Sequence, residues 1–325
     1  MTKDDLIKRI LGSKIFTEWH WFKYHFDFYN IGLEHPFSWS IVDACLKVEE
    51  RIPGFAYKFM DDLASFSGIE KHLPHYEQIL QKLAELYVIN KSIEFEWEEG
   101  TIFYLEPTIG ESNKNPEINI ETPRFIIGIE VKAPSLIDHI NKRTANPFQL
   151  SVRSNQILDV AKNIHGDSIT FPRDNPVKDF LKSANQKFAS FKTLSDKPYF
   201  SSLFIVWDDY IYEPVTALTA PYSGLLTENS FYKDNDGHAV KFPNVDIVIL
   251  LRHLQNIISA TRYEPLIEVS HALDYTHRNV FPPKVFIPVN NEDKIPIDFI
   301  NAFELLPLNS MIGAEYHPSD GIWWI

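Results

Sequence analysis

The segment 125–131 constrains the fold of this chain more than any other part of the sequence. It reads Phe-Ile-Ile-Gly-Ile-Glu-Val and is followed by Lys132. An apolar run this rich in β-branched residues favours a buried strand over a helix. Glu130 and Lys132 are two residues apart, so on a strand both side chains point to the same face. Burying two ionised groups there is costly unless a metal, substrate or partner compensates, and the end of this strand therefore predicts a functional site.

A second acidic residue, Glu117, follows Pro116 shortly before this strand and is expected on a neighbouring strand. Carboxylate and carbonyl oxygens are the ligands that Mg²⁺ prefers, so Glu117, Glu130 and the Val131 carbonyl are the candidate ligands for Mg²⁺ or Mn²⁺. Such an ion polarises a phosphate and lowers the pKa of a bound water. Lys132 would orient that water or neutralise charge on the phosphate oxygens. The residue types predict metal-assisted hydrolysis of phosphodiester bonds.

Pro-Glu, twelve residues and then Glu-Val-Lys resembles the bipartite motif of the PD-(D/E)xK nuclease superfamily, which includes many restriction endonucleases. Glu117 stands where most members have aspartate. The resemblance implies an α/β fold with a mixed central sheet flanked by helices, in the order helix, three strands, helix, strand. The matching segments are a helix at 71–90, strands at 92–98, 101–106 and 125–132, a helix at 176–192 and a strand at 199–207.

The resemblance also implies an activity and auxiliary residues. The activity is that of a Mg²⁺-dependent endonuclease, acting on DNA more readily than RNA, in restriction or phage defence by analogy. Members often carry an acidic residue on the helix before the first strand, and Glu85 is the better candidate, ahead of Glu77. Many also carry Gln or Lys on the helix after the Glu-x-Lys strand, where Gln186 is expected to contact a phosphate or the attacking water. The alternative is that these are ordinary surface charges.

The net charge of −13 opposes binding to a polyanion unless basic residues cluster. The middle third of the chain is the more basic part, which permits a basic cleft on an acidic body. The connection 133–176, with a helix expected at 154–164, is long enough to be a binding loop. The residues expected to contact nucleic acid are Lys142, Arg143, Arg153, Lys182 and Lys187.

The rest of the chain predicts extensions around the core. We expect an aromatic-rich, helical N-terminal extension at 1–70, a nuclease-like core at 71–260, and a C-terminal extension at 261–325 packed on that core. Within the first, the aromatic alternation over 19–29 favours a strand or an irregular aromatic cluster. Within the core, the apolar run 245–251 predicts another buried strand, followed by a helix at 252–262.

Several classes of protein are disfavoured. A single cysteine, Cys45, excludes an intramolecular disulfide and suits a reducing cytoplasm. The N-terminus lacks the apolar segment of a secretory signal, and the longest apolar run is far short of the ~20 residues that cross a bilayer. A soluble cytoplasmic protein is therefore expected. Phosphate-binding glycine loops, a serine-hydrolase elbow and zinc-ligand spacing are missing from the sequence.

Two alternatives stay open. In one, Glu130 and Lys132 form an incidental salt bridge at a solvent-facing strand end, worth ~0–1 kcal/mol. In the other, the chain is a non-catalytic, nuclease-like scaffold that binds a protein partner or forms a homodimer. Metal binding would distinguish the enzyme from the scaffold.

Overall fold

A computed structural model covers the chain. It describes residues 1–110, 114–135, 141, 144–146, 148–150, 155–166, 168–208, 212–262, 264–266, 269–278, 284–290 and 295–310. Among these residues, no helix is both long and apolar enough to cross a lipid bilayer.

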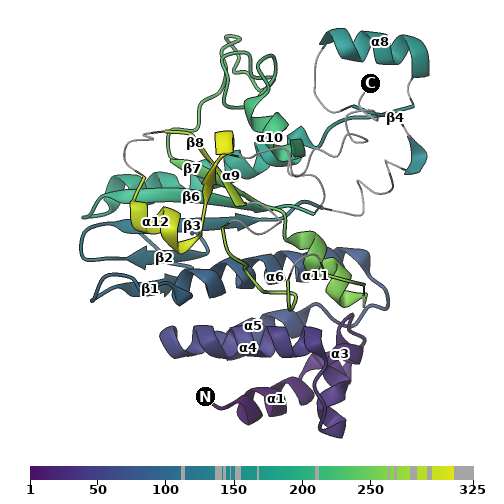
Figure 1. Cartoon of the computed structure of the whole chain (residues 1–325), viewed down its shortest axis with the longest axis vertical. Coiled ribbons are helices and arrows are strands. Elements are labelled where there is room, and N and C mark those ends of the chain that lie inside the picture. The colour runs from purple at the N-terminus through teal and green to yellow at the C-terminus, as the bar shows by residue number, and fades with distance from the viewer. Residues whose placement is uncertain are drawn as a thin grey trace.

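The centre of the described chain is a seven-stranded mixed sheet, in the order β1-β2-β3-β6-β7-β8-β9 (Figure 1). The first three strands are antiparallel, β3, β6 and β7 are mutually parallel, and β8 runs antiparallel to β7. The strands are β1 Ile102–Leu105, β2 Ile118–Glu121, β3 Ile126–Lys132, β6 Tyr199–Val206, β7 Ile247–Leu251, β8 Lys284–Pro288 and β9 Leu306–Pro307. The expected α/β class with a mixed sheet flanked by helices is confirmed.

Helices cover both faces of this sheet (Figure 1). On one face lie α6 (Leu73–Glu94) and α11 (Leu254–Thr261), and on the other α9 (Asp174–Leu194) and α10 (Tyr212–Thr219). Alternate residues of the central strands contribute to two separate hydrophobic clusters, one per face. Burial on both faces explains why β7 is a continuous apolar run and β6 is apolar apart from Ser201 and Ser202, whose hydroxyls are hydrogen-bonded.

The alternation of side chains along β3 determines which face of the sheet its charged residues point to. Ile127, Ile129 and Val131 belong to the cluster on the α6 side. Successive strand residues point to opposite faces, so Glu130 and Lys132 point to the α9 side. The predicted sharing of one face by these two side chains follows from this alternation.

The N-terminal helices form an outer layer that packs on α6 through α4 (Figure 1). Their buried side chains belong to the same hydrophobic cluster as the sheet residues on the α6 side. The first helix begins with a capping box, in which the Thr2 and Asp5 side chains each accept from the other's backbone. The helices are α1 Lys3–Leu11, α2 Lys14–Thr17, α3 Lys23–Asp27, the 3₁₀ helix η1 Phe28–Ile31, α4 Pro36–Arg51 and α5 Phe55–Ser65.

Two predicted strands are wrong. The segment 19–29 is largely helical, because Phe22 and Phe26 are four residues apart and bury the same helical face. The segment 92–98 is no strand either: α6 continues to Glu94, with Ile93 buried inside the fold. The strand that completes the three-stranded unit is β2, whose bounds were missed.

The described residues between β3 and α9 include a small helix-and-strand unit (Figure 1). It contains α8 (Asn155–His165), the expected helix of this connection, beside two short parallel strands, β4 (Phe148–Gln149) and β5 (Ile169–Thr170). Its hydrophobic cluster is separate from the two main ones. After β8, α12 (Ile297–Ala302) contacts α6, and the 3₁₀ helix η3 (Leu308–Ser310) ends the described chain.

Candidate active site

Glu117 and Glu130 lie close together where β2 meets β3. The pairing of the two strands ends at Ile118 and Ile129, and the Glu117 amide, just before β2, donates to the same Ile129 carbonyl at 2.9 Å. This bond offsets Glu117 by one residue from the regular register, and Lys187 contacts both carboxylates. The Glu130 side chain is fully buried and that of Glu117 is 14% exposed. Like charges that are close together and shielded from water repel each other, so these two carboxylates require compensating cations.

Two lysines supply that compensation. Lys132 Nζ lies 2.6 Å from Glu130 Oε1. Lys187, on α9, donates to Glu130 Oε2 at 2.9 Å, lies 2.8 Å from Oε1, and lies 3.6 Å from Glu117 Oε1. One ammonium group therefore contacts both carboxylates. Neither lysine approaches Glu130 Oε1 in hydrogen-bond geometry, and within the described chain this buried oxygen accepts no hydrogen bond.

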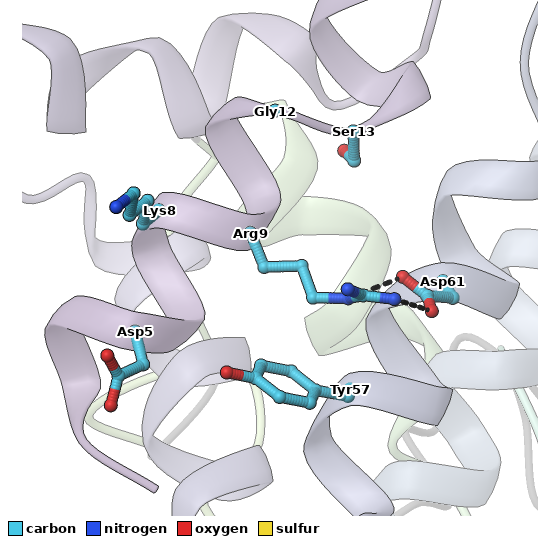
Figure 2. Close-up of a pocket in the computed structure, with 7 residues that line it drawn as sticks. All are labelled: Asp5, Lys8, Arg9, Gly12, Ser13, Tyr57 and Asp61. Carbon is cyan, nitrogen blue, oxygen red and sulfur yellow. Dashed lines mark hydrogen bonds and ion pairs between the residues drawn. The ribbon is translucent and has the colours of Figure 1, made fainter.

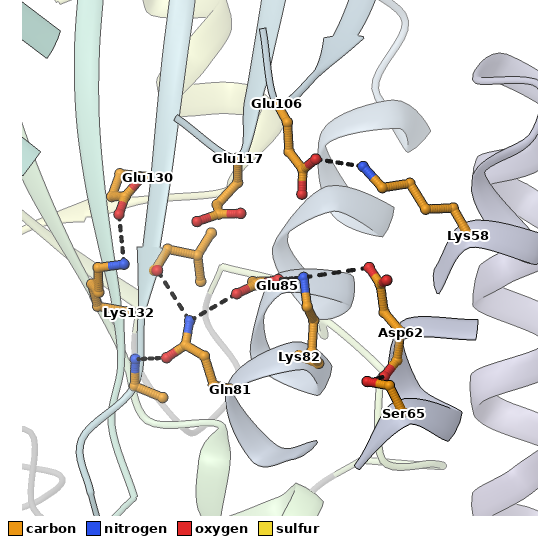
Figure 3. Close-up of polar contacts among 12 residues, drawn as sticks. Lys58, Asp62, Ser65, Gln81, Lys82, Glu85, Glu106, Glu117, Glu130 and Lys132 are labelled. Atoms are coloured by element: carbon orange, nitrogen blue, oxygen red, sulfur yellow. Dashed lines mark hydrogen bonds and ion pairs between the residues drawn. The ribbon is translucent and has the colours of Figure 1, made fainter. Parts of the chain in front are cut away.

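The helix α6 brings a third carboxylate to the same region. Figure 3 shows Glu85 next to Gln81 and Lys82, facing Glu117 across a small hollow. Glu85 accepts from Gln81 Nε2 at 3.1 Å and from Lys82 Nζ at 2.8 Å. The expectation that Glu85, rather than the more distant Glu77, lies near the site agrees with this arrangement, since Glu77 instead accepts from Ser135 at 2.6 Å.

Gln81 is a residue that sequence reasoning missed. Its Nε2 donates to the Val131 carbonyl at 3.1 Å, and its Oε1 accepts from the Ala133 amide at 2.7 Å. These two bonds tie α6 to the end of β3 just beyond the point where β2 stops pairing. A glutamine one turn before Glu85 carries no recognisable signal in the sequence, because its role depends on which strand α6 packs against.

The surroundings of Glu117 make it an unusual acid. Burial, reinforced by the negative charges of Glu85 and Glu130, raises its pKa from 4.5 to about 7, against the opposing effect of Lys187 and Lys132. Burial alone would lower the pKa of Lys187, but its ion pairs with Glu130 and Glu117 outweigh burial and raise it. The site therefore holds charged lysines beside a carboxyl that titrates near neutrality. Strongly perturbed carboxyls are typical of functional sites.

The residue types suit a hard divalent cation. Glu130 Oε1 is a buried carboxylate oxygen contacted by the ammonium groups of Lys132 and Lys187, and Glu117 shares Lys187 with it. The Val131 carbonyl retains one lone pair beside its bond from Gln81. The adjoining hollow, whose rim includes Lys58, Lys82, Glu85, Glu106 and Glu117, has a volume of about 30 Å³. That volume accommodates a water or an ion.

No protein-family model, curated protein or solved structure matches this chain.

The structure separates the two candidates on α9. Gln186 is exposed and accepts from Lys114 at 2.8 Å, whereas Lys187 contacts the carboxylates. Consecutive helical residues are turned by about 100° from each other, so only one of the pair can face the sheet. Lys182, one of the expected nucleic-acid contacts, is exposed on α9. Lys187, another of them, contacts the carboxylates, and Lys142, Arg143 and Arg153 lie outside the described residues.

The described chain offers one group of three metal-ligating side chains whose ligand atoms all lie within 4.8 Å of one another, and it is elsewhere. Asp234, Asp236 and His238 form it on an exposed turn. Asp234 Oδ1 already accepts from the backbone amides of the other two at 3.0 and 2.9 Å. This geometry is that of a turn stabilised by its aspartate, and it adds nothing to the case for a metal there.

Two larger hollows lie away from the carboxylates. The hollow in Figure 2, of about 520 Å³, lies between α1 and α5; there Arg9 pairs with Asp61 through Nε at 3.0 Å and lies over the ring of Tyr57. The other, of about 430 Å³, lies between α4, α6 and the segment 271–277. Its Lys91 pairs with Glu304 at 3.2 Å.

Proposed function

We propose that this chain is a metal-dependent nuclease that hydrolyses phosphodiester bonds, in DNA rather than RNA, with Mg²⁺ or Mn²⁺. The observation that carries the proposal is the close approach of Glu117 and Glu130, with Lys187 at both carboxylates and Lys132 at Glu130. The chain order α6, β1, β2, β3, α9, β6, with β4, α8 and β5 inserted before α9, supports it, because a helix, three strands, a helix and a strand is the order that the resemblance to the PD-(D/E)xK nucleases implies.

The roles follow from the contacts. Glu130, Glu117 and the Val131 carbonyl would hold the ion, which when bound supplies Lewis-acid polarisation of the phosphate and an acidified water. Gln81 fixes the Val131 carbonyl through its bond from Nε2. Lys132, anchored on Glu130, would orient the attacking water or stabilise charge on the phosphate oxygens. The negative charge of Glu85 contributes to the site by raising the pKa of Glu117.

The test is cleavage of supercoiled plasmid with Mg²⁺, compared with a single-stranded DNA and an RNA of the same sequence. Glu130→Gln and Lys132→Met are each expected to lower the rate by more than about 100-fold, in the range seen when a group that stabilises the transition state is removed. Lys8→Met removes a charge from an exposed position on α1, a helix that contributes nothing to the carboxylate site, and should retain the rate. Wild-type rates in both site variants would refute the assignment.

A second candidate function rests on a specific observation. The charges of Glu117 and Glu130 are balanced by Lys132 and Lys187 within the chain. A site neutralised by its own lysines fits a nuclease-like scaffold that docks a protein partner or a second copy. Titration calorimetry with Mn²⁺ distinguishes the two: heat of binding that disappears in Glu130→Gln supports the enzyme, whereas undetectable binding together with a stable protein complex supports the scaffold. A role in restriction or phage defence in the cytoplasm rests on analogy with the nuclease family.

A further inference from the structure

We propose that the ammonium group of Lys187 occupies the position between Glu117 and Glu130 that a divalent cation would take, and that it leaves when such an ion binds. The inference rests on the proposed metal site and adds how that site is regulated. Lys187 competes with cations for the two carboxylates, so that weakly bound cations are excluded. When the divalent ion binds, the Lys187 ammonium is released and can contact the substrate.

Geometry singles out Lys187. Its Nζ lies 2.8 Å from Glu130 Oε1, 2.9 Å from Oε2 and 3.6 Å from Glu117 Oε1. Lys132 is paired with Glu130 at 2.6 Å, and no ion pair of Lys132 with Glu117 is found in the described chain. Lys187 is therefore the lysine that contacts both carboxylates, as a shared metal ion would.

Electrostatic repulsion disfavours simultaneous occupation of this position by the Lys187 ammonium and a divalent ion. A divalent ion held by the same oxygens would lie within a few ångströms of Nζ, in a region where all three side chains are buried or nearly so. At an effective dielectric constant near ~20, charges ~4 Å apart interact strongly, and like charges repel by the same amount. Keeping Lys187 in place would cancel much of the attraction of the carboxylates for the entering ion.

The side chain of Lys187 can move away from the carboxylates toward solvent. Its side chain is 21% exposed, and a lysine ammonium on a flexible four-carbon stem reorients easily. Once released, the ammonium is available for a phosphate oxygen of the substrate. The structure thus assigns Lys187 two opposed effects: it weakens metal binding and it assists binding of the phosphate.

The probe is Mn²⁺, titrated by calorimetry and followed by the electron paramagnetic resonance signal of the free ion, without substrate. Lys187→Met removes the charge and keeps an unbranched stem, and Lys182→Met, five residues earlier on the same helix and exposed, is the matched control. We expect Lys187→Met to bind Mn²⁺ roughly tenfold or more tightly than wild type, because a cation next to the carboxylates is gone. The control should stay within about twofold of wild type. Plasmid cleavage by Lys187→Met should nevertheless fall.

The outcomes separate the inference from the proposed function. If wild type binds Mn²⁺ and Lys187→Met binds it no more tightly, the inference is overturned and the metal site stands. If wild type binds weakly or not at all and Lys187→Met binds, the inference is supported, and the wild-type site is one that its own lysine holds closed. If both proteins fold and neither binds, the carboxylate pair is no metal site, and both proposals fail.

A measurement on the unmodified protein covers the case in which Lys187→Met does not fold. Lysine acylation is quantified by mass spectrometry with and without Mn²⁺, and the rate at Lys187 is compared with that at Lys182. Release of the ammonium should increase labelling at Lys187 several-fold and leave Lys182 unchanged. Equal labelling of Lys187 in the presence of saturating Mn²⁺ would overturn the inference.

Discussion

Replacing Glu117 with glutamine should stabilise the metal-free protein at alkaline pH. The wild-type carboxylate shares Lys187 with Glu130, lines the same hollow as Glu85, and is mostly buried. Glutamine has the same shape and can still occupy the position next to Lys187, but it carries no charge. The substitution therefore isolates the cost of ionising this position inside the fold.

The size and sign follow from the pKa. Burial and the neighbouring carboxylates raise the pKa of Glu117 from 4.5 to about 7. Between these two values the folded protein binds more protons than the unfolded chain, so the free energy of unfolding falls as pH rises through this window. At about 1.4 kcal/mol per pKa unit, the full cost is about 3 kcal/mol once the pH exceeds 7. Glu117→Gln should gain about 2–3 kcal/mol relative to wild type between pH 5 and pH 8.5.

The assay is urea unfolding followed by tryptophan fluorescence, in EDTA, at half-unit steps of pH. Glu121→Gln is the matched control on the same strand; it removes a half-exposed carboxylate that pairs with Lys197 at 2.8 Å, and it should give no gain at any pH. Excess Mg²⁺ should then raise the stability of wild type, because the ion binds the folded state only, and should leave Glu117→Gln unchanged. A difference between Glu117→Gln and wild type that does not vary with pH would refute the reasoning.

Two further predictions concern the fold that positions the site. Gly128→Ala should destabilise the protein by about 2–4 kcal/mol in urea, because the added Cβ would lie 1.9 Å from the hydroxyl of Tyr199, whose buried ring packs against Phe191; wild-type stability would show that the ring can move aside. Burial lowers the pKa of His253, stacked on Tyr87, to about 4, so stability is lost as pH falls from 6.5 toward 4. The stability difference between wild type and His253→Gln should therefore be about 2 kcal/mol smaller at pH 5 than at pH 7.5, and an equal difference at both pH values would contradict this.

The sequence predicted those parts of the fold whose signal is local. β7 is a continuous apolar run, and β3 and β6 are largely apolar, which favours burial within a sheet. β2 was missed because four residues with a polar Asn119 give a weak pattern; that residue is buried because its side chain accepts from the Tyr199 hydroxyl at 2.8 Å. The aromatic run around Phe26 was misread because alternation and helical spacing coincide in a segment that is aromatic almost throughout.

The distinction between local sequence signals and tertiary contacts also applies to the site. Glu117, Glu130 and Lys132 could be found from spacing, since two of them share a strand and the third precedes its neighbour. The choice between Gln186 and Lys187 depended on the rotation of α9 about its axis, which no local pattern determines. Gln81 depended on α6 packing against the end of β3. Residues whose positions depend on tertiary contacts were thus the ones that sequence reasoning left unresolved or missed.

The energetics of the carboxylate pair argue for a function over a structural ion-pair cluster. A buried ion pair contributes little net stability, and apolar residues of similar volume often replace it without loss. Here the buried Glu130 and the mostly buried Glu117 share Lys187, and Lys132 adds a second cation at Glu130. Glu85 lines a hollow with Glu117, whose pKa is still raised to about 7. The two lysines therefore leave Glu117 costly to ionise in the folded protein. A bound divalent cation would remove that cost, which is the behaviour we expect of a metal site. If Glu117→Gln is more stable than wild type only when metal is absent, the Glu117 carboxylate serves metal binding and not the stability of the fold.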